Sequence, residues 1–171
     1  MRSINLDDLE ILPLVEEDIP ENLELLNLVI REGHFLAQRE EISEREAREF
    51  FEYWVESGLA IYLVAKYNGK IIAHISCRGR TEDRLYHIAN IGYLVHPDYR
   101  KLGIGSLLIE RTINLAPNKD FEILVAEVSD DNTRSIRLLK KFGFEKFGRL
   151  KNALKIDDND NRDIIMFSKH L

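Results

Sequence analysis

The chain has 171 residues and a formal net charge of −6, from 24 lysines and arginines against 30 acidic residues. This length suits one domain around one core, and a hydrophobic fraction of 44% is that of a globular protein rather than a disordered one. The acidic balance argues against a protein that grips nucleic acid or an anionic membrane, because either task needs a dense basic face.

The number of cysteines and the length of the apolar runs indicate the cellular compartment. Cys77 is the single cysteine and cannot form an internal disulfide, and no Cys/His cluster has the spacing of zinc ligands. The first ten residues carry charges where a signal peptide needs an apolar run, and the longest apolar run, 59–65, is too short to span a bilayer. We therefore expect a cytoplasmic protein with no metal site and no membrane segment.

The first half of the chain predicts a strand, two helices and a hairpin. Apolar residues at 9, 11 and 14 indicate a short strand, and Pro20 then opens a helix with a recurrent apolar side: Leu23, Leu26, Leu28, Val29 and Ile30. Ser43 followed by Glu46 has the spacing of a capping box and opens a second helix that runs to Gly58. Two strands, 60–67 and 70–77, flank Asn68-Gly69, a strong hairpin signal.

The second half predicts alternating strands and helices. A strand over 85–95 is interrupted at Gly92, where we expect a bulge, and a helix over 103–116 and a strand over 121–128 follow. Asp131 or Asn132 caps a further helix that ends at Gly143, and strands over 144–150 and 163–167 flank a polar loop at 157–162. The fold class is therefore mixed α/β, one domain over 1–171 with a mostly antiparallel sheet and one parallel crossover.

The stretch 95–106 is a candidate phosphate-binding turn, because it joins a predicted strand directly to a predicted helix. Gly103 and Gly105 leave backbone N–H groups at a helix N-terminus open to an anion, and Arg100 and Lys101 add two cations. No Lys-Ser/Thr pair follows the second glycine, so an ATP-binding P-loop is not indicated. Leu108 stands where a dinucleotide-binding fingerprint has its third glycine, so NAD is not indicated either. The alternative is a tight strand-to-helix turn with solvated basic residues.

Two motifs in this order resemble the GNAT superfamily of acyl-CoA-dependent N-acyltransferases: Arg100-x-x-Gly103-x-Gly105 after Val95-His96-Pro97, then Asn132-x-x-Ser135-Ile136-x-Leu138 with Gly143-Phe144. The resemblance covers the whole chain in element order. It implies a twisted sheet of about seven strands with helices on both faces. It also implies a splayed cleft between the strands over 85–95 and 121–128.

The resemblance implies acetyl-CoA as cosubstrate and assigns a set of residues to it. Amides of the turn would hold the pyrophosphate, the backbone around Tyr93 would pair with pantetheine by strand addition, and Asn132 would bind the pantetheine arm. The implied coenzyme A residues are Tyr93, Leu94, Val95, Arg100, Lys101, Leu102, Gly103, Ile104, Gly105, Ser106 and Asn132.

The sequence departs from the family pattern at two catalytic positions. Asn90 stands where many members have a glutamate as general base, and Leu139 where a tyrosine commonly protonates the leaving thiolate. Glu127 is our first candidate for a substitute base, followed by His87 and His74, and each also has a purely structural interpretation. Without a strong base the site favours α-amines, whose reference pKa is about 7.7–8.0, over lysine amines at about 10.4.

The acceptor region is the least specific part of the sequence. The segment 32–36 lies where the family builds the acceptor wall, so His34 and Phe35 are substrate-binding candidates, although Phe35 also fits a residue that anchors the loop. Nothing pairs Cys77 with a base, so we expect it to be a buried apolar residue rather than a nucleophile.

We therefore predict an N-acetyltransferase. It would move an acetyl group from acetyl-CoA to an amino acid, peptide N-terminus or small amine by direct attack in a ternary complex. The alternatives are a non-catalytic acyl-CoA-binding regulatory module, which the two departures from the family pattern favour, and a plain interaction domain. A homodimer through a carboxy-terminal strand edge is compatible with the sequence, which does not establish it.

Overall fold

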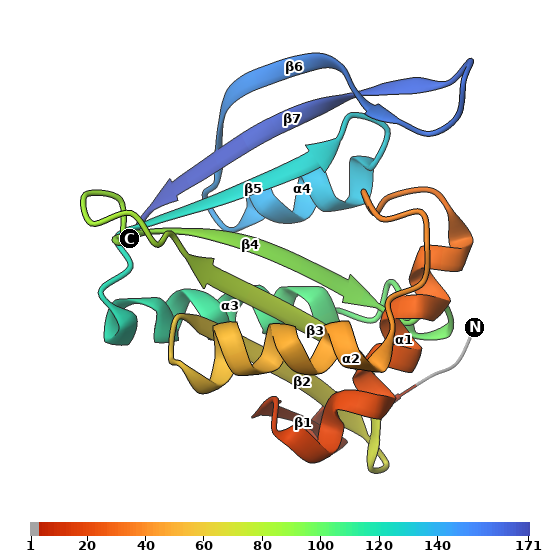
Figure 1. The fold of residues 1–171 in the computed structure, drawn as a ribbon, viewed down its shortest axis with the longest axis vertical. Helices are drawn as coiled ribbons and strands as arrows, with labels where there is room; N and C mark the ends of the chain where they lie inside the picture. The colour runs from red at the N-terminus through yellow and green to blue at the C-terminus, as the bar shows by residue number, and fades with distance from the viewer. Residues whose placement is uncertain (1–3) are drawn as a thin grey trace.

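The computed structural model describes residues 4–171, which form a seven-stranded sheet in the order β1-β2-β3-β4-β5-β7-β6 with four α-helices (Figure 1). The strands are β1 (Leu9–Pro13), β2 (Ala60–Tyr67), β3 (Lys70–Gly79), β4 (Ile88–Val95), β5 (Ile123–Ser129), β6 (Glu145–Lys155) and β7 (Asn161–His170). The helices are α1 (Ile19–Glu32), α2 (Glu44–Phe50), α3 (Ile104–Leu115) and α4 (Thr133–Lys141), and a π-helical turn, Phe51–Glu56, extends α2. Short 3-10 turns lie at Leu6–Asp8, Glu16–Asp18, Pro97–Tyr99 and Ala116–Lys119. The predicted order of strands and helices is confirmed.

The centre of the sheet opens where its one parallel pair separates. All neighbouring strands are antiparallel except β4 and β5, whose ladder runs only from Ile88↔Ile123 to Asn90↔Val125 before the two strands diverge (Figure 1). This confirms the predicted splay. The predicted bulge at Gly92 is wrong, because the register between β3 and β4 is unbroken. The cleft opens because β5 leaves β4, and β4 itself stays regular.

Helices cover the two faces of the sheet unequally. On one face α3 and α4 pack on the larger core cluster, which includes Ile75, Leu108 and Leu139. On the other face α1 and α2 pack on a smaller cluster with Val64 and Leu94 at its centre, and this cluster contains no residue of β5, β6 or β7. The α1/α2 face is therefore packed over the first half of the sheet, up to β4.

The buried side of α1 agrees only in part with the predicted apolar side, of which Val29 and Ile30 are buried. Leu25 and two asparagines, Asn22 and Asn27, are buried, whereas Leu23 and Leu26 are only half-buried. Asn27 exchanges two hydrogen bonds with the backbone of Ile42, Nδ2 donating to the carbonyl at 2.9 Å and Oδ1 accepting from the amide at 2.8 Å, and so fixes the segment before α2. The two leucines are half-buried because they line a cavity, described below.

The entry to the second helix confirms the predicted capping box. Ser43 Oγ accepts from the Glu46 amide at 3.3 Å, and Glu46 Oε2 accepts from the Ser43 amide at 2.8 Å. Across residues 4–171, no helix is both long and apolar enough to cross a membrane.

Candidate active site

The turn between β4 and α3 has the geometry of an anion site. Gly103 is the N-cap of α3 with φ +89°, and Lys101 also lies in the left-handed region with φ +66°. No side chain among the described residues caps this helix. The Ser106 amide donates to the Gly103 carbonyl at 2.9 Å, so the amides that stay open to an anion are those of Ile104 and Gly105. The sequence-predicted phosphate turn therefore has the required backbone.

A cavity of about 370 Å³ extends from this turn along β4 and α4. Ten of the eleven predicted coenzyme A residues line it: Tyr93, Leu94, Val95, Arg100, Lys101, Gly103, Ile104, Gly105, Ser106 and Asn132. Leu102 is not in the lining, because it packs against the larger core cluster instead. We call this space the first cavity.

Three polar residues of α4 that are not among the predicted coenzyme A residues also line the first cavity: Arg134, Ser135 and Arg137. Asn132 is the N-cap of that helix, and its Oδ1 accepts from the Ser135 amide at 3.2 Å. Arg134 and Ser135 lie within one turn of this cap, so the sequence could have indicated them, whereas Arg137 lies further along the helix.

Arg100 does not supply the free cation that the sequence suggested. Its Nε donates to the Val95 carbonyl at 3.0 Å, and its guanidinium forms a two-pronged ion pair with Glu32 at the end of α1, Nη1 to Oε1 at 2.9 Å. Glu32 therefore balances the positive charge of Arg100, which fastens α1 to the turn. The cations of the first cavity that have no carboxylate partner among residues 4–171 are Lys101, Arg134 and Arg137.

The backbone of β4 presents alternate peptide groups to the splay. The His96 amide donates to Ile72 of β3 at 2.8 Å, which fixes the even-numbered residues of β4 as those that bond to β3. Peptide groups of the odd-numbered residues Tyr93 and Val95 then face β5, beyond the last paired residue, Asn90. The Leu94 backbone instead pairs with β3, so of the three predicted backbone contacts the geometry favours two.

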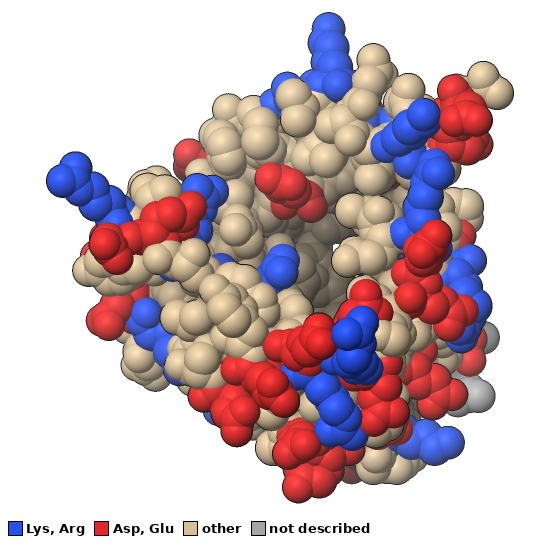
Figure 2. Space-filling view, viewed as in Figure 1, with Lys and Arg blue, Asp and Glu red and all other residues tan. Residues whose placement is uncertain are grey.

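A second cavity, of about 430 Å³, lies between the sheet and helices α1 and α2. Its sheet side includes Tyr62, His74, Ser76 and Arg78, and its helical side includes Leu23, Leu26, Phe50 and Phe51. Leu36, Tyr93 and Leu94 line both cavities, so the two spaces adjoin at β4 beside the splay. Figure 2 shows the face drawn in Figure 1 hollowed near its centre, with acidic and basic side chains gathered mainly around the rim.

A buried polar cluster forms part of the second cavity. Asn22 Nδ2 donates to the Tyr62 hydroxyl at 2.9 Å, and His74 Nδ1 lies 2.7 Å from Asn22 Oδ1. Burial lowers the pKa of His74 to about 3 and raises the pKa of Tyr62 to about 12, so both are neutral near pH 7. Because Asn22 Oδ1 only accepts, we assign the ring proton of His74 to Nδ1. A histidine this reluctant to take a proton is a poor general base.

Tyr93 connects the splay to α4. Its hydroxyl lies 2.5 Å from Ser135 Oγ, and the residue borders both cavities. Burial raises the pKa of Tyr93 to about 12, so the phenol keeps its proton at neutral pH. This protonated hydroxyl, bonded to Ser135 of the first cavity, thus belongs to a residue that borders both cavities.

Of the predicted catalytic candidates, His74 lines the second cavity, whereas Glu127, Asn90 and His87 lie outside both cavity linings. Asn90 ends the β4/β5 ladder, where it pairs with Val125. Because side chains alternate along a strand, Glu127 lies on the same sheet face as Val125 and Asn90, which is the face that forms the floor of the second cavity. The structure does not bring His87 to the cavities, because it precedes β4 and is six residues, or about 20 Å of strand, from Tyr93.

The remaining predicted residues divide between the loop after α1 and the core. Phe35 lines the first cavity rather than the acceptor side, and His34 is exposed and lines neither. Cys77 is fully buried, and burial raises the pKa of its thiol to about 12, which fits a core residue rather than a nucleophile.

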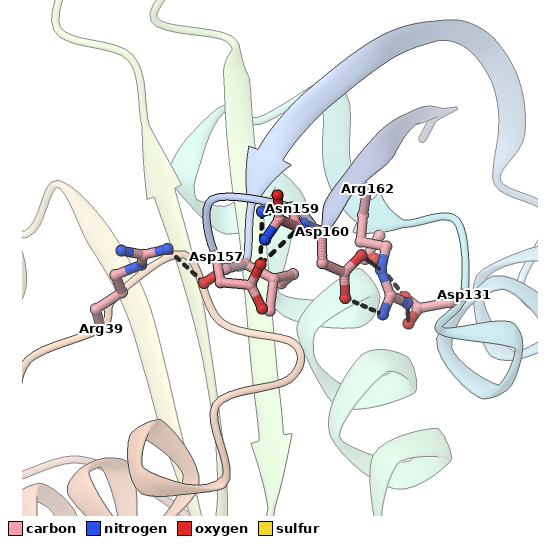
Figure 3. A network of polar contacts seen from close by, with 8 residues as sticks. Arg39, Asp131, Asp157, Asn159, Asp160 and Arg162 are labelled. Carbon is pink, nitrogen blue, oxygen red and sulfur yellow. Dashed lines mark hydrogen bonds and ion pairs between the residues drawn. The ribbon is translucent and has the colours of Figure 1, made fainter.

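A polar network fastens the loop after α1 to the β6–β7 hairpin (Figure 3). Arg39 Nη2 donates to the main-chain carbonyls of Lys155, at 3.1 Å, and Ile156. Within the hairpin Asp157 accepts from two amides of the turn, and Arg162 pairs with Asp160 and with Asp131, which precedes α4 (Figure 3). The loop that lines both cavities is thereby held at its far end.

The open turn, the splayed strands and the adjoining cavities are the features of an acyl-group transferase. The sequence model of the Acetyltransferase (GNAT) family matches residues 24–144, and the chain belongs to this family of acyltransferases. A Bacillus subtilis (strain 168) protein provisionally named phosphinothricin acetyltransferase YwnH is 25% identical over 141 residues, 82% of this chain and 86% of that protein. A second protein of that organism, provisionally named as an alanine N-acetyltransferase of ribosomal protein bS18, is 30% identical over 118 residues, 69% of this chain and 74% of that protein. The crystal structure of an acetyltransferase of the GNAT family from Streptococcus pneumoniae superposes with a TM-score of 0.89 and 26% identity, covering 95% of this chain and 99% of that one.

Proposed function

We propose that the protein transfers the acetyl group of acetyl-CoA to the primary amine of an amino acid, peptide N-terminus or small amine, by direct attack in a ternary complex. One observation carries the proposal: the two cavities share a wall, at Leu36, Tyr93 and Leu94, beside the splayed strands. Two substrates held in adjoining cavities would meet there, which supplies the proximity that direct transfer needs. The names of the two relatives, which give phosphinothricin and a ribosomal-protein alanine as acceptors, agree with an amine acceptor.

The first cavity fits acetyl-CoA. The open amides after Gly103 suit the pyrophosphate, and the unpaired Lys101, Arg134 and Arg137 suit its phosphate charge. The peptide groups of Tyr93 and Val95 would pair with the amides of the pantetheine arm as an added strand would. The Val95 N–H is then our candidate for the donor that stabilises negative charge on the thioester oxygen.

The acceptor would enter through the second cavity and present its amine at the splay. Glu127 remains our candidate base, acting through water, because it shares the sheet face of that cavity with Asn90, which would orient the water. A base of this kind is weak, so acceptors with α-amines, partly neutral near pH 7.5, should react faster than lysine side chains. The Glu127→Gln variant should then lose activity most at low pH.

Tyr93 should assist the departure of coenzyme A as a hydrogen-bond donor, in place of the tyrosine that Leu139 replaces. The Tyr93→Phe variant is expected to lower kcat by about 10-fold at pH 7, a modest loss because a thiol with a pKa of about 8.5 already leaves readily as the thiolate. Its affinity for acetyl-CoA, measured by calorimetry, should stay within about twofold of wild type, because the backbone contacts remain. An unchanged kcat would remove Tyr93 from the mechanism.

Titration calorimetry with acetyl-CoA, followed by thiol release with amino acids, polyamines and peptides over a pH series, tests the proposal. Binding together with amine-dependent thiol release would support it, and the pH profile should rise with the deprotonation of the acceptor amine. Binding without release would favour the non-catalytic acyl-CoA module. No binding would reject both interpretations.

A further inference from the structure

Arg78 occupies an unusual position for a cation. It lies on β3 directly opposite Asn90 of β4, on the sheet face that forms the floor of the second cavity, and its side chain is part of the cavity lining. The guanidinium carbon is 5.7 Å from the ring centroid of Phe50 and 5.7 Å from that of Trp54. Both rings lie within cation–π distance of the guanidinium and leave its N–H groups for another partner.

Arg78 has no anionic partner among the described residues. Its Nε is buried without a hydrogen-bond partner, and none of the ion pairs of residues 4–171 includes its guanidinium. Arg78 is half-buried as a residue, and a partly desolvated charge is costly unless something pairs with it. Since its neighbours in the fold do not, the natural partner is a molecule in the cavity.

The remaining groups of the second cavity leave Arg78 uncompensated. Glu46 is the one carboxylate in its lining, and that carboxylate is occupied in the α2 cap, accepting from the amide and hydroxyl of Ser43. His74 is neutral, and Tyr62 and Ser76 are uncharged at neutral pH. The two charges of the lining, Arg78 and Glu46, balance formally, but the Glu46 carboxylate is engaged with Ser43 and makes no ion pair with the guanidinium, so Arg78 is left without a direct partner.

We propose that the second cavity selects amine acceptors that also carry a carboxylate, which binds the guanidinium of Arg78. A carboxylate matches the planar fork of arginine with two parallel hydrogen bonds, which a neutral amide or a second ammonium group does not do. The acceptor class is thus an amino acid or a short peptide with an acidic group near its amino end, and polyamines are disfavoured. This inference rests on the proposed acetyl transfer and names its substrate class.

The test compares matched acceptors that differ only in the anionic group. Wild-type enzyme is assayed for thiol release with free amino acids, the corresponding amino acid amides, Asp-Ala and Asn-Ala dipeptide amides, and a diamine. For each pair, kcat/KM with the acid is divided by kcat/KM with the amide. This ratio is then compared between Arg78→Gln and wild type, so that the intrinsic reactivity of each amine cancels. A preference confined to free amino acids identifies the α-carboxylate, and a preference within the dipeptide pair identifies a side-chain carboxylate.

We expect Arg78→Gln to lower the acid-over-amide ratio by about 30-fold, as loss of a charge-assisted bidentate contact should. Arg78→Lys should retain part of the preference, and Arg78→Glu should shift it toward the diamine. The affinity for acetyl-CoA should be unchanged in all three variants. Equal loss of activity with acids and amides would overturn the inference, as would a wild type that acetylates both equally well.

A second measurement covers the case in which the variants do not fold. Carboxylates that lack an amine should inhibit the wild type competitively against the acceptor, and their amides should not. Inhibition by both or by neither would overturn the inference while acetyl transfer itself stands. An enzyme that binds no acetyl-CoA, or releases no thiol with any amine, would instead refute the proposed function.

Discussion

Replacing Gly105 with glutamate is expected to weaken acetyl-CoA binding by at least about 100-fold. The new carboxylate would lie in the first turn of α3, where it takes the open amides for itself and repels the pyrophosphate. The fold should survive, because an acidic side chain at the start of a helix is favourable. Titration calorimetry gives the affinity, and thermal unfolding checks the fold.

Two control variants separate charge from shape. In Gly105→Ala the added Cβ would stand 3.1 Å from Leu138 Cδ2, a flexible side chain that needs to give by only a few tenths of an ångström, so affinity should change by less than about tenfold. Asn114→Glu adds the same charge on the exposed surface of α3 and should leave affinity unaltered. Wild-type affinity in Gly105→Glu would show that the pyrophosphate lies elsewhere.

His74 should make the protein sensitive to acid. Its folded-state pKa is about 3 against about 6.5 in an unfolded chain, so between those values the unfolded state takes up a proton that the native state refuses. The contribution of His74 to the free energy of unfolding is therefore fully present above about pH 6.5. It is lost as the pH falls, at up to about 1.4 kcal/mol per pH unit. From pH 6 to pH 4 the loss should reach about 2 kcal/mol.

The His74→Gln variant isolates this effect from the titration of carboxylates. Its free energy of unfolding, measured with urea at several pH values, should fall less steeply than that of wild type between pH 6 and pH 4. The ring resonances of His74 in the native protein should also show no titration down to pH 4. Parallel stability curves, or a ring that titrates near pH 6, would contradict the burial of a neutral imidazole.

Features encoded by neighbouring residues could be predicted from the sequence. The capping box at Ser43, the hairpin turn at Asn68-Gly69 and the turn before α3 each depend on side chains or glycines within a few positions, so local chemistry determines them. The order of elements then follows from hydrophobic periodicity. These features also carried the resemblance to the GNAT family and the position of the first cavity.

Features formed by distant segments could not be predicted in the same way. Glu32 and Arg100 are 68 residues apart, and nothing in either segment indicates that the carboxylate balances the guanidinium. The contact of Arg78 with two rings of the α2 region likewise depends on how that region packs on β3. The bulge expected at Gly92 failed for a related reason, because the splay is a property of the strand pair rather than of one glycine.

The tie between Arg39 and the β6–β7 hairpin has a consequence for ionic strength. Its acceptors are main-chain carbonyls of Lys155 and Ile156, which carry no net charge, whereas the hairpin is joined to the residue before α4 by the Arg162–Asp131 ion pair. Salt screens an exposed ion pair far more than a hydrogen bond to a carbonyl. In concentrated salt the tip of the hairpin would therefore lose its ion pair with the start of α4 before it loses its contact with the loop after α1, while the β5–β7 ladder and the hydrogen bond from the Asp130 amide to the Asp163 carbonyl keep the rest of the hairpin in place.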